Sequence, residues 1–103
     1  MREINQLLIP GVTLQRTEKR TTIKGKSYNY AQYYVYIPKK FEALVKDKEW
    51  LVTVILDDQE IPIGLKKPTK HNKHYIITLP SNLAVYWEKY VYKEVTILLE
   101  RTG

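Results

Sequence analysis

The sequence predicts a mainly β fold in which one domain contains two similar halves. Apolar runs rich in Val, Ile, Thr and Tyr recur along the chain, which is typical of short strands. Two of these runs end at Ile37-Pro38 and Leu79-Pro80, and a helix-like segment follows each. The length of 103 residues fits a single domain. We therefore assign 1–103 to one domain, with internal repeats at 11–57 and 58–103.

Each half is predicted to contain three strands in the same order. The second strands of the two halves lie 42 residues apart and the third strands 43 residues apart. This agreement in order and apolar phase favours a duplication, and the alternative is a chance likeness between two β-rich segments. The expected strands are, half by half, 11–14, 33–37 and 52–57, then 61–65, 75–79 and 95–100.

A short helix is expected after each Ile-Pro or Leu-Pro step, near 38–46 and 80–89. Proline has no N–H and a fixed φ, so it suits the first position of a helix. Apolar residues follow at i, i+3 and i+4, which places one apolar stripe on one face of each helix. The two stripes are Phe41, Leu44 and Val45 in the first half and Leu83, Tyr86 and Trp87 in the second.

The charge of the chain indicates an anionic partner. Lys and Arg number 17 against 11 Asp and Glu, which leaves a net charge of +6. The windows 16–26 and 66–74 each carry a net charge of +4, so the excess positive charge lies in these two segments. A small basic domain suggests a nucleic-acid partner, although basic proteins without a specific anionic ligand are common.

The first basic segment predicts a β-hairpin arm over 16–32 that projects from the domain. Its centre, 24–27, is a glycine-containing turn between strand-like segments. Tyr28 and Tyr30 lie on this arm, where they could stack on unpaired bases or donate hydrogen bonds to phosphates. Packing across the hairpin is the alternative role for both. The second segment, 67–73, is expected to form a shorter basic turn.

Several classes of function find no support in the residues. The absence of Cys excludes disulfides, thiolate metal sites and cysteine nucleophiles. His71 and His74 lack further ligands nearby, and Asp57, Asp58 and Glu60 resemble solvated turn residues. We expect no enzyme activity, no metal and no cofactor. No apolar run is long enough to span a membrane and no signal sequence is evident, so an intracellular, cytoplasmic setting is expected, in a host cell if the protein is viral.

The order of a basic segment, a strand ending in Ile-Pro or Leu-Pro, a short helix and a Val/Thr/Ile strand resembles the AbrB/MazE/SpoVT swapped-hairpin barrel family. The likeness covers nearly the whole chain, once in each half. It implies a small β-barrel of two fused β-β-α-β repeats, so that a monomer could complete the barrel, with a homodimer left open. The segments 47–49 and 89–91 stand where the family has Gly-Asp, and its Gly-Arg before the strand is missing from both halves.

The resemblance implies binding to double-stranded DNA, with transcription regulation as the expected role. The alternatives are an RNA or single-strand binding protein that stacks bases on the arm tyrosines, and a protein-interaction module of an antitoxin-like or viral accessory kind. The basic positions that match the family's DNA-binding segment, together with the two arm tyrosines, give the candidate DNA-binding residues Arg16, Lys19, Arg20, Lys24, Lys26, Tyr28, Tyr30, Lys66, Lys67, Lys70 and Lys73.

Overall fold

The structure, a computed structural model, describes residues 5–57 and 59–101 and is mainly β, as the sequence predicted. Asp58 of the acidic group named above lies outside the described residues. The strands are β1 (Gln6–Ile23), β2 (Lys26–Tyr36), β3 (Trp50–Ile55), β4 (Glu60–Lys66), β5 (Thr69–His71), β6 (His74–Leu79) and β7 (Glu94–Glu100). The helical segments are α1 (Lys39–Val45), η1 (Ser81–Leu83), α2 (Ala84–Trp87) and η2 (Glu88–Tyr90).

The strands form one antiparallel sheet in the order β4-β3-β7-β1-β2-β6-β5. β1 is long enough to pair with β7 through its first part and with β2 through its second part. The change of partner follows a bulge between Ile9 and Val12, where Gly11 has a φ of 71°. A bulge bends the strand and increases its twist, so β1 can curve from one partner to the other.

The closed barrel that the resemblance implied is not present, because the sheet stays open with β4 and β5 at its two edges. The two edge strands are separated by only Lys67 and Pro68. β5 occupies the free edge of β6 from Ile76 to His74, and Pro62 within β4 has no N–H to donate to a further strand. The sheet therefore curls around its core without hydrogen-bonded closure.

The core lies on the inner face of this curled sheet. Buried residues alternate along the strands, as in Val52 and Val54 of β3 and Val95, Ile97 and Leu99 of β7. The opposite residues of these strands point away from the core. Removing this apolar surface from water is the main favourable contribution to folding.

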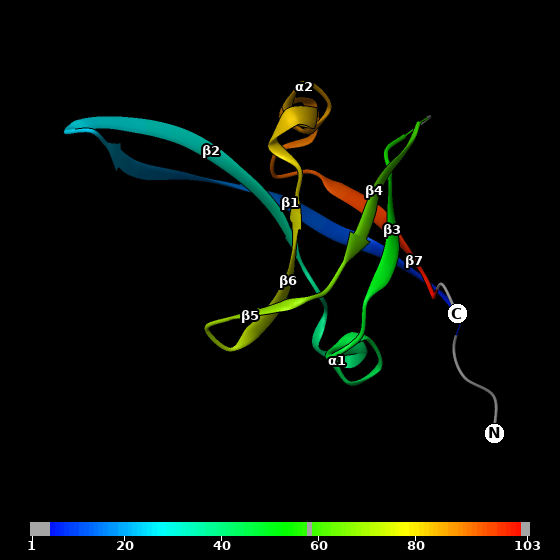
Figure 1. Cartoon of the computed structure of the whole chain (residues 1–103). Coiled ribbons are helices and arrows are strands. Elements are labelled where there is room, and N and C mark those ends of the chain that lie inside the picture. Colours follow the sequence, from blue (N-terminus) through cyan, green and yellow to red (C-terminus); the bar gives the residue numbers. More distant parts are fainter. Residues whose placement is uncertain (1–4, 58, 102–103) are drawn as a thin grey trace.

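The two helices lie at opposite ends of the sheet (Figure 1). Their apolar stripes reach the core unequally: Val45 and Trp87 are fully buried, whereas Leu44 and Tyr86 are 36% and 37% exposed. Phe41 and Leu83 pack against the core from partly buried positions. Proline precedes each helical segment, but as the capping residue with extended ψ, 142° at Pro38 and 133° at Pro80, and not as the first helical residue that we predicted.

The predicted hairpin is formed by the second part of β1 and the first part of β2, and it projects from the rest of the molecule (Figure 1). It makes the molecule elongated, with principal extents of 55 × 30 × 24 Å. Lys24 and Gly25 form the two-residue turn, with φ values of 51° and 80°. Positive φ at both central residues is characteristic of the type I′ turn, whose twist matches that of the flanking strands.

Candidate nucleic-acid interface

The register of the hairpin places its candidate residues on two different faces. Thr21 pairs with Tyr28 and Lys19 with Tyr30, so these side chains point to one side. Arg20 pairs with Asn29 and points to the other side, where its Nε lies 3.5 Å from the Asn29 Oδ1. The cations of the arm are therefore divided between the faces of the ribbon.

A row of aromatic side chains continues along the first of these faces beyond the arm. Tyr28 and Tyr30 are 49% and 50% exposed, and Tyr34 and Tyr36 follow on the same side of β2. The rings of Tyr34 and Tyr36 make an edge-to-face contact, with centroids 5.4 Å apart. We call this surface the tyrosine face; it consists of Thr17, Lys19 and Thr21 of β1 and Lys26, Tyr28, Tyr30, Gln32, Tyr34 and Tyr36 of β2.

A hydrogen bond with the Tyr36 side chain, followed by partial burial, raises the pKa of Tyr34 to about 12. The Tyr34 hydroxyl, like an ordinary tyrosine hydroxyl with a pKa near 10, is protonated at neutral pH and adds no negative charge to the tyrosine face, and the raised pKa extends this neutral state to alkaline pH. This matters because a phenolate would repel a phosphate-bearing ligand.

Part of the tyrosine face lines a groove of about 210 Å³ that crosses β1, β2, β6 and β5. Its lining combines hydroxyl, amide, ammonium and ring groups, and none of the described lining residues carries a carboxylate. His71 stands beside Tyr34, with ring centroids 6.3 Å apart. The lining residues are Thr17, Lys19, Gln32, Tyr34, Thr69, His71, Ile76 and Thr78.

Arg16 differs from the other arm cations because it is bound to the body of the protein. Its Nε lies 3.0 Å from the Glu88 Oε2, and the Tyr33 hydroxyl donates to the same carboxylate. A weaker pair at 3.5 Å joins Arg16 to Glu18. This cluster connects the base of the arm to η2, so Arg16 supports the position of the arm and has less freedom to contact a ligand.

The hydrogen bond from Tyr33, and to a lesser extent the bond and charge of Arg16, lower the pKa of Glu88 against the opposing effect of burial. A carboxyl whose folded pKa is lowered stabilises the fold above its unfolded pKa, and this stabilisation is lost as the pH falls through the folded pKa. We expect the melting temperature of Glu88→Gln to fall less than that of the wild type between pH 6 and pH 3.

Thermal unfolding of both proteins followed by circular dichroism across this range would measure the difference. Glu60→Gln is the matched control, because Glu60 is exposed on β4 and forms no ion pair with a described residue. If Glu88→Gln kept the full acid sensitivity of the wild type, the cluster would contribute nothing to the pH dependence of stability.

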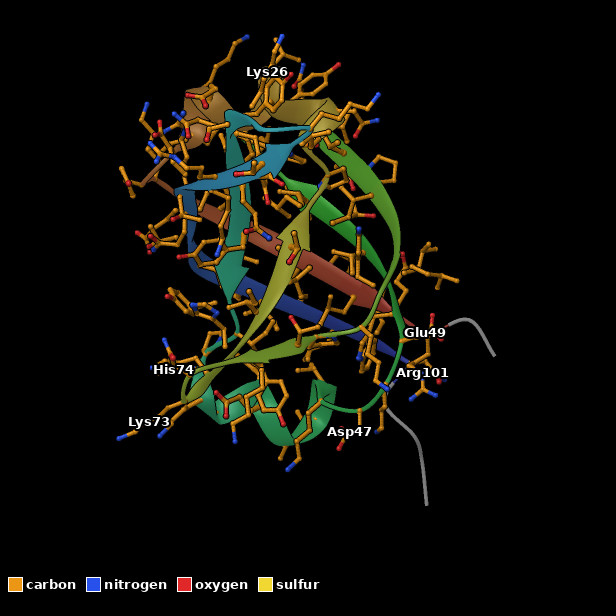
Figure 2. The ribbon with its side chains drawn as sticks, turned by 60° about the vertical axis from the view of Figure 1, so that its left-hand side comes forward. Lys26, Asp47, Glu49, Lys73, His74 and Arg101 are labelled. Carbon is orange, nitrogen blue, oxygen red and sulfur yellow. The ribbon has the colours of Figure 1, made fainter. Side chains whose placement is uncertain are left out.

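The second basic segment lies at the opposite end of β2 from the tip of the arm. β6 pairs with β2 from Tyr36↔Ile76 to Tyr33↔Leu79, so the turn before β6 lies beside the end of β2. Figure 2 shows the separation, with Lys26 and Lys73 at opposite ends of the molecule. Ten residues of strand span about 33 Å. The tip of the arm and the second segment therefore do not form one compact patch, although Lys19, nearer the base of the arm, lines the groove together with His71.

Within the second segment the four lysines occupy different elements. Lys66 ends β4, Lys67 follows it, Lys70 lies in β5, and Lys73 lies in the turn between β5 and β6. The structure thus brings Lys19, Lys26, Tyr28 and Tyr30 onto one surface and leaves the others elsewhere.

The site predicted from the sequence omitted five residues of the tyrosine face, Thr17, Thr21, Gln32, Tyr34 and Tyr36, and also His71, which lines the groove. For the strand residues a signal was available, because the turn at 24–25 fixes the register and the period of two then assigns each residue of β1 and β2 to a face; the hairpin gives no such signal for His71 in β5. The His71 and His74 rings were expected to be solvated, and both residues are exposed. The centroid of the His74 ring lies 5.6 Å from that of the Tyr36 ring. Among the described residues no group of three His, Cys, Asp or Glu is placed to hold a metal ion.

No known protein-family model, curated protein or solved structure matches this chain. Within the part of the chain that the structure describes, no helix has the length and apolar character needed to cross a membrane.

Proposed function

We propose that the chain is a double-stranded DNA-binding protein, and that it acts as a transcription regulator without catalytic activity. The observation that carries this proposal is the projecting two-stranded ribbon, with Lys24 and Lys26 at its tip and cations on both faces. The major groove of B-DNA, about 12 Å wide, admits a ribbon of this kind. Lys side chains on the ribbon would neutralise phosphates, which dominates affinity for DNA.

The separation of the two basic segments supports a single duplex as the partner. The length of β2 between them, about 33 Å, is close to one helical turn of B-DNA, about 34–36 Å. A duplex that accepts the arm could therefore meet Lys70 and Lys73 about one turn away. In this arrangement Lys66 and Lys67 would remain peripheral phosphate contacts.

Arg20 is our candidate for reading a base edge. Guanidinium groups bind guanine through two hydrogen bonds, and Arg20 is exposed, with one weak contact to Asn29 among the described residues. Arg16, in contrast, would act by positioning the arm through Glu88. Sequence preference should therefore depend on Arg20 more than on Arg16.

We also propose that the two halves of the chain are repeats related by an approximate twofold axis. The strand pairing supports this: β3 pairs with β7 and β2 with β6, and each pair takes equivalent strands from the two halves. The pairing of β1 with β7 corresponds to that of β4 with β3, and each contains a bulge next to an Ile-Pro step, Ile9-Pro10 or Ile61-Pro62. The fused swapped-hairpin arrangement is consistent with this symmetry, although the sheet is open.

A competition assay tests the proposed function. A labelled duplex of mixed sequence is bound by the protein at 50 mM salt and challenged with unlabelled duplex DNA, single-stranded DNA of equal length, or structured RNA. We expect duplex DNA to compete best. If single-stranded DNA or RNA competed as well as duplex DNA or better, that nucleic acid would be the preferred ligand and the duplex proposal would be wrong. Absence of binding to every nucleic acid would overturn it and leave an acidic protein as the partner.

The row of tyrosines favours single-stranded nucleic acid as a second candidate ligand. Residues two apart on a strand are separated by about 6.7 Å, roughly twice the 3.4 Å spacing of stacked bases. Tyr28 and Tyr30 could therefore stack on alternate bases, with Lys19 and Lys26 close to the phosphates. This binding would use the tyrosine face and would not require insertion of the ribbon into the major groove of a duplex.

We expect Tyr30→Ala to weaken binding of a single-stranded oligonucleotide by about 1–3 kcal/mol if Tyr30 stacks on a base. Fluorescence anisotropy with an oligothymidine would measure the change. Tyr30→Phe is the matched control, because it keeps the ring and removes only the hydroxyl. Equal loss in both variants would show that the hydroxyl, and not stacking, makes the contact.

A further inference from the structure

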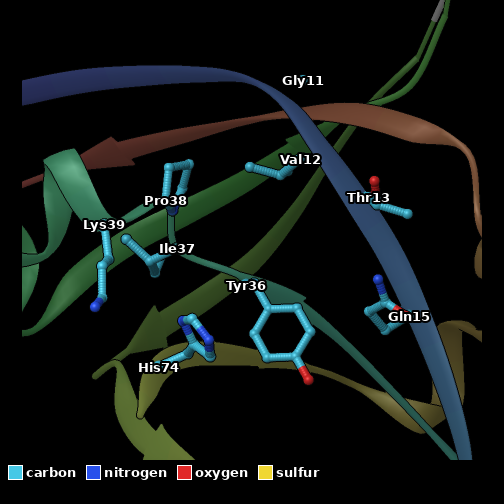
Figure 3. Close-up of a pocket in the computed structure, with 9 residues that line it drawn as sticks. All are labelled: Gly11, Val12, Thr13, Gln15, Tyr36, Ile37, Pro38, Lys39 and His74. Atoms are coloured by element: carbon cyan, nitrogen blue, oxygen red, sulfur yellow. The ribbon is translucent and has the colours of Figure 1, made fainter.

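A second cavity, of about 590 Å³, opens where β1 leaves β2 (Figure 3). The two strands pair only as far as Leu14↔Val35, after which β1 runs beside β7 and β2 turns into α1. Leu14 N donates to Lys93 O at 3.0 Å on the β7 side, while Ile37 N donates to Tyr75 O at 2.8 Å on the β6 side. This divergence of the backbone, which the bulge at Gly11 allows, makes the cavity part of the fold.

The lining of the cavity combines an apolar wall with a polar rim. Val12 and Ile37 are buried and contribute apolar surface, while Thr13 and Gln15 contribute a hydroxyl and an amide from β1. Small-molecule sites combine apolar walls with a few convergent polar groups in this way, and their usual volume of 300–1,000 Å³ includes that of this cavity.

Two flat rings and an ammonium group define the open side. The rings of Tyr36 and His74 meet edge to face, with centroids 5.6 Å apart. In Figure 3 His74 and Lys39 lie on one side of the Tyr36 ring, and Gln15 and Thr13 lie on the other. None of the described residues that line the cavity carries a carboxylate, but the Glu94 Oε2 lies close to Gly11, so an anionic group is favoured toward Lys39 and not toward Gly11. The cavity therefore suits a ligand that has both a flat ring and an anionic group.

We propose that this cavity binds a nucleoside monophosphate. The base packs against the Tyr36 ring and the apolar wall, with Gln15 and Thr13 able to hydrogen-bond to its polar edge. The phosphate lies toward the Lys39 ammonium and the His74 ring, since both groups can donate hydrogen bonds to it. The same chemistry is offered by a free mononucleotide and by the terminal nucleotide of a strand. No residue of the arm takes part, so the inference does not require the proposed duplex binding.

Titration of the full chain with AMP, followed by NMR or calorimetry, tests this inference. We expect saturable binding, with adenosine and ribose 5-phosphate each binding at least tenfold more weakly than AMP, because each lacks one of the two recognised groups. Lys39→Ala should weaken AMP binding about tenfold, the size expected for a lost charged hydrogen bond, and leave adenosine binding unchanged. Lys39 is exposed, so this variant should fold.

Lys40→Ala is the matched control, because the neighbouring ammonium lies over the Phe41 ring and does not line the cavity. Tighter binding of a 5′-phosphorylated trinucleotide than of AMP would identify a strand end as the ligand. Tighter binding of AMP than of the trinucleotide would identify a free nucleotide. Either result supports the site. Equal weakening by Lys39→Ala and Lys40→Ala, or no saturation with AMP, would overturn it. If the wild-type protein bound AMP but did not bind duplex DNA, the proposed function would be contradicted and the AMP site would stand.

Discussion

Replacement of Trp87 by Ala should lower the free energy of unfolding by about 3–5 kcal/mol, the range for a large aromatic side chain removed from a core. Trp87 is fully buried between α2 and the sheet, and its Nε1 donates to the Pro80 carbonyl at 2.8 Å. The substitution would leave both a cavity and a part-buried carbonyl without its donor. Since small domains are stable by only about 5–15 kcal/mol, a substantial part of the total stability would be lost.

Urea unfolding of the variant and the wild type would measure this difference. Trp87→Phe separates the two effects, because it keeps most of the ring and removes the donor, with an expected cost of about 1–3 kcal/mol. Val85→Ala is the surface control: Val85 is 67% exposed in the same helix, and its replacement should change stability by at most about 0.5 kcal/mol. Similar losses in Trp87→Ala and Val85→Ala would contradict the assignment of Trp87 as a core anchor.

Duplex DNA binding by the wild type should weaken about 500-fold when the salt concentration rises fourfold. This value assumes five phosphate contacts, each contributing about −0.9 to the slope of log affinity against log salt. Replacement of Lys24 and Lys26 together by Ala should reduce the slope from about −4.5 to about −2.7, because two of those contacts would disappear. Both side chains lie at the exposed tip of the arm, so the fold should be unaffected.

Fluorescence anisotropy with one duplex at several salt concentrations would give both slopes. Lys46→Ala is the control, because Lys46 follows α1 and is exposed at the far end of the molecule from the arm. An unchanged slope in the double variant would remove the tip of the arm from the interface. A slope that changed equally in Lys46→Ala would indicate general charge attraction without a defined contact surface.

Local patterns predicted much of this structure because they depend on neighbouring residues. A turn over 24–27 and a helix after each of the two prolines were predicted from short segments. The structure contains all three, but the turn is limited to Lys24 and Gly25 and the second helix is divided among η1, α2 and η2. The burial of Val45 and Trp87 also followed from helical spacing. In these cases the backbone preference and the apolar period indicate the same structure, so tertiary contacts had little to override.

The arrangement of the two basic segments could not be predicted in the same way. It depends on the pairing of β2 with β6, whose register joins Tyr36 to Ile76 and sets the turn before β6 far from the tip of the arm. The cluster of Arg16, Tyr33 and Glu88 likewise joins residues up to 72 positions apart. Charge counting along the sequence gives no information about such distances in space.

The position of β7 between β1 and β3 has a consequence for the order in which the protein can assemble during translation. β7 is the last described strand to leave the ribosome, yet it supplies the partner for the first part of β1 and for one edge of β3. The arm hairpin needs only neighbouring residues and can form early, but the centre of the sheet must wait for 94–100. Until then the edges of β1 and β3 that pair with β7 lack their hydrogen-bond partner, and such unpaired edges can associate with other chains.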